Sequence, residues 1–217
     1  MSATRILVAD DHEVVRRGIR ALLESQPGWK VCGEAVTGEE AVQKTKSLEP
    51  DVVVLDIGMP ELNGLEATRR IRKEAPKSEV LILTMHESEQ VVREVLAAGA
   101  RGYVLKSDAG RDLIAAVKAV RNHSPFFTSR VATMVLDGYL KGKPGVAEGL
   151  PTSRLTVRER QVVQLLAEGN STKEVASALG VAVRTADTHR TNIMRKLDIH
   201  SLSELVRYAI RNRIIEA

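Results

Sequence analysis

Polar side chains that could do chemistry together follow several short apolar runs of this 217-residue sequence. They are Asp10, Asp11, Asp56, Thr84 and Lys106. Carboxylates held close together repel one another, and a divalent cation that binds oxygen relieves this repulsion. Mg²⁺ suits such ligands, whereas the sequence has no cluster of His and Cys that indicates zinc. A lysine and a hydroxyl would help to hold a phosphoryl group, and an aspartate can accept that group as an acyl phosphate.

Asp56 follows four apolar residues, three of them β-branched, between Pro50 and Gly58. This pattern predicts a strand buried on both faces, as in parallel sheets. A carboxylate at the carboxyl end of such a strand lies where open α/β sheets bind ligands. Two structural alternatives stay open: Asp56 caps a loop, or the charged strand ends form salt bridges only.

The elements that must position these residues alternate along the first half of the chain. Strand patterns cover 5–10, 31–36, 51–55, 80–84 and 102–106. Helix patterns cover 14–25, 37–47, 64–74, 88–98 and 108–121. Five strand–helix units predict an α/β fold, a doubly wound five-stranded parallel sheet of flavodoxin-like order 2-1-3-4-5, with helices on both faces. The carboxyl ends of its strands converge on one edge, which brings the polar residues together.

Charge and composition differ between the two halves. Residues 1–122 hold 18 Lys and Arg against 19 Asp and Glu, whereas residues 123–217 hold 14 against 9. The basic half is therefore the candidate for contact with nucleic acid. No run has the roughly 18 apolar residues of a membrane helix, and the N-terminus lacks a secretory pattern, so we expect a cytoplasmic protein. Cys32 is the single cysteine, which excludes an internal disulfide.

The first half resembles the receiver domain of two-component response regulators over residues 5–121. The motifs are Asp10-Asp11, Leu-Asp56-Ile-Gly-Met-Pro with Gly64, Leu-Thr84-Met-His, and Gly-Tyr103-Val-Leu-Lys106. The resemblance implies that Asp56 accepts phosphate from a histidine kinase and that Thr84, Tyr103 and Lys106 respond. It also implies that Asp10, Asp11, Asp56 and the Gly58 carbonyl position Mg²⁺. For Tyr103, a plain aromatic residue at a strand edge is the alternative to a switch.

Sequence signals for the ends of helices occur in both halves of the chain. The Ser/Thr-x-x-Glu capping-box pattern occurs at 37–40, 156–159, 171–174 and 201–204, while Ser88 and Asp108 are N-cap types and Gly99 is a C′ type. We expect a receiver domain over 1–122, a linker over 123–153 with a short helix near 128–140, and a last domain over 154–217. In that domain, helices near 156–168, 171–179, 183–197 and 201–213 predict an all-α four-helix helix-turn-helix module.

The last domain resembles the DNA-binding domain of LuxR-type regulators, which places the chain with the NarL/FixJ-type response regulators. The match includes Leu-Thr156-Val-Arg-Glu-Arg, Lys173-Glu-Val-Ala, Asn-Ile193 and Glu204-Leu-Val-Arg-Tyr-Ala. Two residues depart from the family pattern. Ala182 replaces a serine N-cap, which forfeits about 1 kcal/mol. Asp187 replaces a lysine that faces the groove; a carboxylate can accept a hydrogen bond from cytosine, so we expect an altered base preference.

Residues for contact with DNA and with a second copy follow from this resemblance. The expected DNA contacts are Arg184, Asp187, Thr188, Arg190, Thr191, Arg195 and Lys196. In the family, part of the last helix forms the dimer contact on DNA, which implies Leu202, Leu205, Val206 and Ala209. His189 is expected to face the interior of the module, with a DNA contact as the alternative, and Glu159 is expected to be structural.

The leading hypothesis is a regulator whose phosphorylation at Asp56 controls sequence-specific DNA binding and transcription. Its expected partners are a histidine kinase, double-stranded DNA, a second copy of the chain and RNA polymerase, with no membrane. It would not be an enzyme beyond Mg²⁺-dependent phosphorylation and dephosphorylation of itself. A phosphoaspartate phosphatase or phosphotransferase is one alternative, but it needs a second Asp at the position of Gly58. A module whose second domain binds protein is another.

Overall fold

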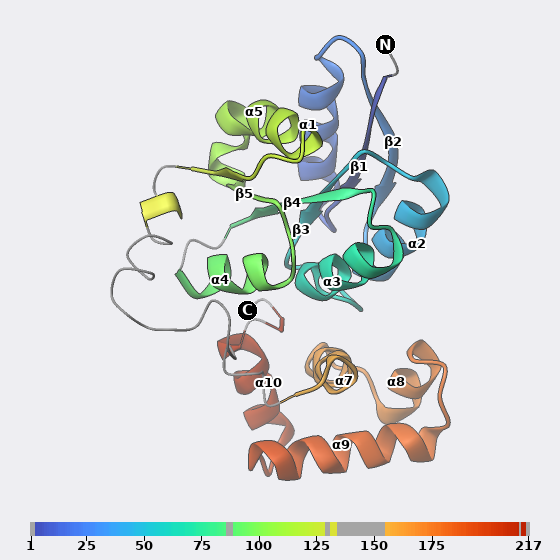
Figure 1. Cartoon of the computed structure of the whole chain (residues 1–217). Coiled ribbons are helices and arrows are strands. Elements are labelled where there is room, and N and C mark those ends of the chain that lie inside the picture. The colour runs from blue at the N-terminus through green and yellow to red at the C-terminus, as the bar shows by residue number, and fades with distance from the viewer. Residues whose placement is uncertain (1–2, 86–88, 129–130, 134–154, 213, 216–217) are drawn as a thin grey trace. The chain divides into compact units, whose positions relative to one another are not determined.

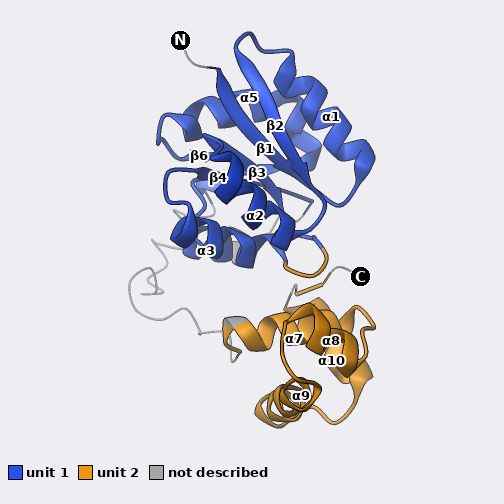
Figure 2. Cartoon of the chain, turned by 90° about the vertical axis from the view of Figure 1, so that its right-hand side faces the viewer, with its two compact units in different colours: residues 1–59, 63–143 blue, residues 60–62, 144–217 orange. Residues whose placement is uncertain are grey.

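The chain forms two compact units, which Figure 2 colours separately. The first comprises residues 1–59 and 63–143, and the second comprises 60–62 and 144–217. The structure, a computed structural model, describes residues 3–85, 89–128, 131–133, 155–212 and 214–215 (Figure 1). Within the expected helix at 128–140, residues 131–133 are helical. Apart from residue 128, the rest of that helix lies outside the described residues, as does the expected 123–153 linker from residue 141 on.

The first unit is a parallel sheet with helices on both faces (Figure 1). The strand order is β2-β1-β3-β4-β5-β6. The strands are β1 (Thr4–Ala9), β2 (Trp29–Ala35), β3 (Val52–Asp56), β4 (Glu79–Thr84), β5 (Gly102–Leu105) and β6 (Phe126–Phe127). The helices are α1 (Glu13–Glu24), α2 (Gly38–Leu48), α3 (Gly64–Glu74), α4 (Glu89–Ala97), the 3₁₀ turn η1 (Lys106–Asp108) and α5 (Ala109–Arg121). The predicted doubly wound fold is confirmed.

Burial on both faces explains why β3 and β4 show no alternation of polar and apolar residues. Every residue of β3 and of β4 is buried, because helices cover both faces of the sheet. Toward one face, Ile6, Val8 and Val54 pack against Leu23 of α1 and Val117 of α5. Figure 1 shows α2, α3 and α4 on the other face. The central strands are therefore held rigidly, and so are the residues at their carboxyl ends.

A sixth strand, β6, was not predicted. It pairs in parallel with β5, with Gly102 opposite Phe126 and Tyr103 opposite Phe127. Only two residues take part and both are half-buried, so the segment lacks the length and the apolar run from which a strand is inferred. The pairing depends on the path of the chain after α5, which brings the Phe126 N–H within 3.1 Å of the Arg101 carbonyl oxygen.

The predicted caps of the first unit have mixed outcomes. Thr37 accepts a hydrogen bond from the Glu40 N–H as expected, but the Glu40 carboxylate reaches the N–H of Val36 instead of closing the box. Gly99 has φ +89°, as a C′ residue requires. Asp108 stands at the N-cap position of α5, as predicted, but its side chain makes no capping hydrogen bond and its carboxylate pairs with Arg111. Ser88 lies outside the described residues.

The second unit has four described helices around one apolar core. They are α7 (Val157–Ala167), α8 (Thr172–Ala178), α9 (Val183–Leu197) and α10 (Leu202–Arg211). Full capping boxes at Thr156 and Ser171 begin α7 and α8, as predicted. Ser201 caps α10, although the Glu204 carboxylate accepts from the His200 N–H. In the part of the chain that the structure describes, every helix is too short or too polar to span a bilayer.

A buried carboxylate joins the amino end of β4 to the chain after α5. The Glu79 side chain is 4% exposed and pairs with Arg72 at 3.1 Å, Arg101 at 2.9 Å and His123 at 2.7 Å. Arg101 also donates to the His123 carbonyl oxygen, 3.0 Å away. Burial acts to raise the pKa of Glu79, but the hydrogen bonds from Arg101 and His123 outweigh it, and the net pKa is lowered.

We expect Glu79→Gln to lower the free energy of unfolding by about 2 kcal/mol at neutral pH, because the partly exposed Arg72 and Arg101 lose the charged acceptor of their hydrogen bonds at a buried position. A carboxyl whose pKa is lowered on folding stabilises the fold above its unfolded pKa of about 4.3 and loses that contribution as pH falls through the folded value. Urea unfolding at pH 7 and near pH 3 should therefore show a difference between the two proteins that shrinks in acid. An equal difference at both pH values would contradict this role.

Candidate functional site

The structure brings two of the predicted carboxylates and the predicted lysine together at one edge of the sheet. Asp10 follows β1, Asp56 ends β3, and Lys106 follows β5; the two carboxylates are 1% and 2% exposed. The Lys106 ammonium nitrogen lies 2.8 Å from Asp10 Oδ2 and 2.8 Å from Asp56 Oδ2. The second contact is a hydrogen bond, whereas the first is an ion pair whose angles do not suit one.

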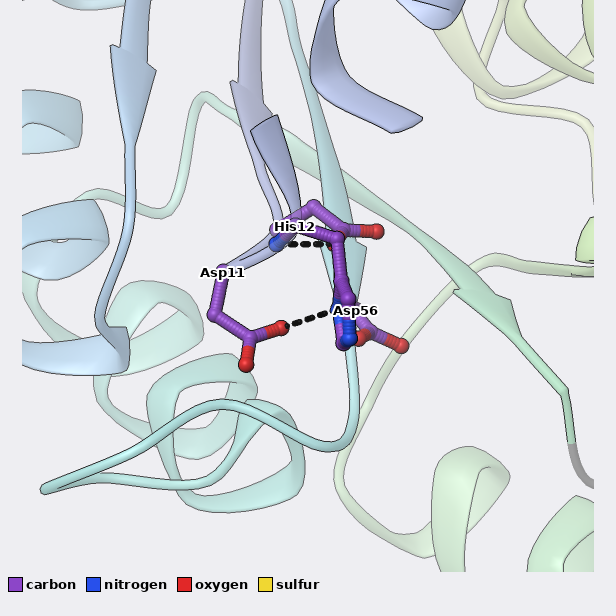
Figure 3. Close-up of side chains that lie close together, drawn as sticks. Asp11, His12 and Asp56 are labelled. Atoms are coloured by element: carbon purple, nitrogen blue, oxygen red, sulfur yellow. Dashed lines mark hydrogen bonds and ion pairs between the residues drawn. The ribbon is translucent and has the colours of Figure 1, made fainter. Parts of the chain in front are cut away.

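Asp11 and His12 complete the acidic pocket. One ligand atom from each of Asp10, Asp11, His12 and Asp56 lies within 4.8 Å of the others. His12 Nδ1 is 2.8 Å from Asp11 Oδ1 and 3.4 Å from Asp10 Oδ1, and Figure 3 shows the contact between His12 and Asp11. Inspection of the sequence missed His12. Its position directly after the acidic pair, at the end of a buried strand, was the available signal.

The loop between β3 and α3 holds Asp56 in place through its backbone. The Ile57 N–H donates to Asp56 Oδ1 at 2.8 Å, and the Gly64 N–H donates to the Ile57 carbonyl oxygen at 2.9 Å. Gly58 lies half-buried in this loop, two residues after Asp56. A Cβ on Gly64 would meet the Asp56 carbonyl oxygen at 1.9 Å. Only glycine therefore allows α3 to begin so close to the strand.

We expect Gly64→Ala to destabilise the first unit by about 3 kcal/mol, because the methyl group would push α3 away from the backbone of Asp56. Urea unfolding measures the change. The matched control is Gly110→Ala in α5, where a Cβ would meet nothing within 4 Å; alanine favours helix there and should be neutral or stabilising. Equal stability of the two variants would contradict the close approach.

Thr84 and Tyr103 lie on adjacent strands beside this pocket. Thr84 ends β4 in register with Leu105, and Tyr103 is in register with Ile82. Both side chains are 0% exposed. Thr84 therefore ends its strand at the same edge as Asp56, while Tyr103 lies two residues further back along β5. The polar strand ends that were predicted to converge do lie at one edge.

The electrostatics of the pocket fit a phosphoryl group with a divalent cation. Burial acts to lower the pKa of Lys106, but the attraction of Asp56, the close contact with Asp10 and the hydrogen bond to Asp56 outweigh it and raise the pKa. Lys106 is thus an ammonium at neutral pH. Three carboxylates and one ammonium leave two negative charges, which one divalent cation would balance. Carboxylate oxygens are the donors that Mg²⁺ takes, so the residues present fit that ion.

In the second unit, α9 presents a polar and mainly cationic face. The predicted contact residues Arg184, Asp187, Thr188, Thr191, Arg195 and Lys196 are exposed, and Arg190 is half-buried. The inner face packs Ala186, Ile193 and Leu197 into the core, while His189 is half-buried. Ala182 provides no side-chain cap for the helix, as expected.

Side chains of α7 fix both ends of α9. Arg158 donates to the Leu179 carbonyl oxygen at 2.6 Å, which holds the turn before α9. Glu159 pairs with Lys196 at 2.7 Å near the other end. Burial acts to raise the pKa of Glu159, but the hydrogen bond from Lys196 and those from Thr156 outweigh it and lower the pKa. Glu159 thus has the structural role that we expected, and Lys196 already has a partner within the unit.

The residues expected at the dimer contact separate into two groups. Leu205 and Ala209 are 0% exposed and belong to the core of the second unit. Leu202 is 47% exposed and Val206 is half-buried. A buried side chain cannot reach a second copy without unpacking its own unit, so we assign Leu205 and Ala209 to packing. Leu202 and Val206 stay as the proposed contact.

Comparison with known proteins decides what these two sites belong to. Residues 6–118 match the family model described as response regulator receiver domain, and residues 153–209 match the model described as bacterial regulatory proteins, luxR family. The chain belongs to the response-regulator family. This response regulator combines a receiver domain with a LuxR-type DNA-binding domain, as NarL/FixJ-type members of two-component systems do, and it is a regulator of transcription.

Relatives match this response regulator along nearly its whole length. The transcriptional regulatory protein LiaR of Bacillus subtilis is 36% identical over 211 residues, which cover 97% of this chain and 99% of LiaR. The oxygen regulatory protein NreC of Staphylococcus haemolyticus is 36% identical over 215 residues, which cover 98% of this chain and 99% of NreC.

Solved structures resemble it as well. The RcsB response regulator of Salmonella typhimurium aligns with a TM-score of 0.64 at 26% identity, over 96% of this chain and 97% of RcsB. A LuxR-family two-component response regulator from Aurantimonas sp. SI85-9A1 aligns with a TM-score of 0.61 at 35% identity, over 64% of this chain and 99% of that one.

Proposed function

We propose that a histidine kinase phosphorylates Asp56 and that this phosphorylation controls sequence-specific DNA binding by α9. The observation that carries the proposal is the pocket at the sheet edge, where Asp56 is buried beside Asp10 and held by the Lys106 ammonium at 2.8 Å. A buried carboxylate with a cationic partner and further acidic groups is suited to phosphoryl transfer.

In the proposed reaction, an oxygen of the Asp56 carboxylate attacks the phosphorus of a phosphohistidine. The phosphorus–nitrogen bond breaks, an acyl phosphate forms, and the kinase imidazole leaves with its electron pair and takes up a proton. Lys106, already hydrogen-bonded to Asp56 Oδ2, would bind a phosphoryl oxygen. Mg²⁺, held by Asp10, Asp11, Asp56 and the Gly58 carbonyl, would neutralise phosphoryl charge. A small phosphodonor could replace the kinase, and attack by water on the phosphorus would restore Asp56.

The proposed response begins at Thr84 and Tyr103. The Thr84 hydroxyl would donate to a phosphoryl oxygen, and Tyr103 would turn into the space that Thr84 leaves. Both side chains are fully buried on adjacent strands, so a change at either requires neighbouring side chains to move. The phosphoryl group adds about 1.5 to 2 negative charges, which biases this pair toward the phosphorylated arrangement.

The proposed output is a dimer on DNA. Arg184, Arg190, Arg195 and Lys196 would bind phosphate and groove, with Lys196 exchanging Glu159 for a phosphate oxygen. Structures of RcsB include two RcsB dimers bound to two parallel DNAs, with a TM-score of 0.58 and 26% identity to this chain. Leu202 and Val206 would form the contact between copies. In this proposal the protein acts in the cytoplasm, with RNA polymerase as a further partner.

The test is DNA affinity with and without acetyl phosphate and Mg²⁺. Genomic fragments selected by the phosphorylated protein serve as probes in a gel-shift titration. We expect tighter binding after phosphorylation, because a phosphorylated receiver favours the dimer and two linked DNA-binding units bind two half-sites together. Equal affinity in both states would contradict phosphorylation control. Absence of a steep salt dependence would contradict contact with DNA phosphates.

A further inference from the structure

Arg16, near the start of α1, holds the loop that carries the acidic pair. Its side chain is 12% exposed, and its guanidinium Nη1 donates to the Asp10 carbonyl oxygen at 2.8 Å. That oxygen belongs to the peptide group between Asp10 and Asp11. The orientation of this peptide group sets the direction in which the second carboxylate leaves the loop, so Arg16 acts on the pocket although its own side chain is not part of it.

The backbone of Asp10 lies where the hydrogen-bond ladder of β1 ends. Its N–H still donates to the Ala35 carbonyl oxygen of β2 at 3.1 Å, and the residue is 1% exposed. The pairing of β1 with β3 stops one residue earlier, at Ala9. A buried carbonyl oxygen beyond the end of a ladder needs a donor from elsewhere in the fold. Arg16 supplies that donor and thereby fixes the peptide group that follows Asp10.

Glu34 of β2 anchors the same guanidinium on its other side. Arg16 Nε lies 3.4 Å from Glu34 Oε2, and Arg20 Nη1, one turn further along α1, lies 2.9 Å from Glu34 Oε1. Arg20 is 49% exposed and also pairs with Glu24. Within the described part of the chain, both ion pairs of Arg20 are thus with glutamates outside the acidic loop. The two arginines share one carboxylate, but Arg16 is the one that also holds the loop.

We propose that Arg16 is a positioning residue for the phosphorylation of Asp56, because it fixes the peptide group between the two carboxylates that precede α1. This inference rests on the proposed function. Groups that orient metal ligands account for about 10- to 100-fold in metal affinity, and a displacement of about 1 Å can cost a similar factor in rate. Once the cation is bound, it holds the loop as well. Loss of Arg16 should therefore raise the Mg²⁺ requirement more than it lowers the rate at saturating Mg²⁺.

The test compares Arg16→Met with Arg20→Met in the full chain. Both substitutions keep an apolar stem and remove one guanidinium from Glu34, but they differ in the contact with the Asp10 carbonyl. The rate of labelling by acetyl phosphate is measured over a range of Mg²⁺ concentrations. We expect Arg16→Met to raise the Mg²⁺ concentration for half-maximal labelling by about tenfold. Arg20→Met should match the wild type.

Titration of the unphosphorylated proteins with Mg²⁺, followed by amide NMR, gives a readout that does not depend on phosphoryl transfer. It should show the same shift in half-saturation. Arg16→Lys should lie between Arg16→Met and the wild type, because an ammonium cannot hold the carbonyl and Glu34 together. If Arg16→Met does not fold, Arg16→Lys decides, and no rise in its Mg²⁺ requirement would overturn the proposal.

Two further outcomes would overturn it. A purely structural role would lower the free energy of unfolding of Arg16→Met in urea and leave the Mg²⁺ requirement of the folded protein unchanged. An equal rise in Arg20→Met would assign the effect to charge near Glu34 and not to the loop. If the wild type binds Mg²⁺ but is never labelled, the proposed function fails, whereas the NMR titration still tests the role of Arg16.

Discussion

Asp56→Asn should abolish the labelling of this protein by radioactive acetyl phosphate in the presence of Mg²⁺. An amide oxygen is a far weaker nucleophile than a carboxylate and cannot form the acyl phosphate. The substitution also removes one of the two carboxylates that hold Lys106. Asn occupies nearly the same volume as Asp, so the circular dichroism spectrum should stay that of the folded chain. Label retained on protein gels is the measurement.

The matched control is Asp51→Asn, at the other end of the same strand. Asp51 is exposed and accepts a hydrogen bond from the Arg5 N–H at 2.7 Å, which an amide oxygen can also accept. We expect its labelling to equal that of the wild type. Label on Asp56→Asn at the wild-type level would show that another group is the acceptor, and loss of label from Asp51→Asn would show that the effect is not specific to the pocket.

Asp187→Lys should tighten binding to mixed DNA by about tenfold and add about one to the slope of log affinity against log salt, because one new cation meets the phosphates. Asp187 is exposed on the same face of α9 as Arg184, Thr188 and Thr191. In the major groove its carboxylate can accept from cytosine N4 but not from guanine, which presents only acceptors there. The variant should therefore also select different sites, with the discrimination at one base pair changed by about 1 to 3 kcal/mol. Anisotropy titrations and sequencing of selected DNA measure both effects.

The control is Glu24→Lys at the end of α1, which makes the same change in net charge within the receiver. Its side chain is 37% exposed and pairs with Arg20. If net charge alone improves DNA binding, the DNA affinity of both variants should rise equally. If Asp187→Lys binds more tightly but selects the same sequence as the wild type, the carboxylate repels phosphate without reading a base.

The buried strands and the capped helices could be predicted from the sequence because their signals are local. Four consecutive apolar residues before Asp56 mark a strand covered on both faces, and Thr156 and Ser171 mark helix starts with their own side chains. Since parallel strands end at one edge, the convergence of Asp10, Asp56 and Lys106 followed from chain order alone. The family was recognisable because its motifs are also local in the sequence.

The features decided only by the tertiary structure depend on contacts between distant segments. The pairing of Lys196 with Glu159 and the burial of Leu205 and Ala209 depend on how the helices of the second unit pack. An amphipathic pattern shows that a helix has an apolar face, but not whether its own unit or a second copy covers that face. The position of β6 depends on the turn after α5, where His123 is anchored to Glu79.

His12 shows the same limit at the site itself. The sequence by itself determined the acidic pocket, because each carboxylate ends or follows a strand of known direction. Whether the next side chain points over that pocket or away from it depends on the turn between β1 and α1, which no periodicity records. The fold alone decided that the imidazole lies 2.8 Å from Asp11.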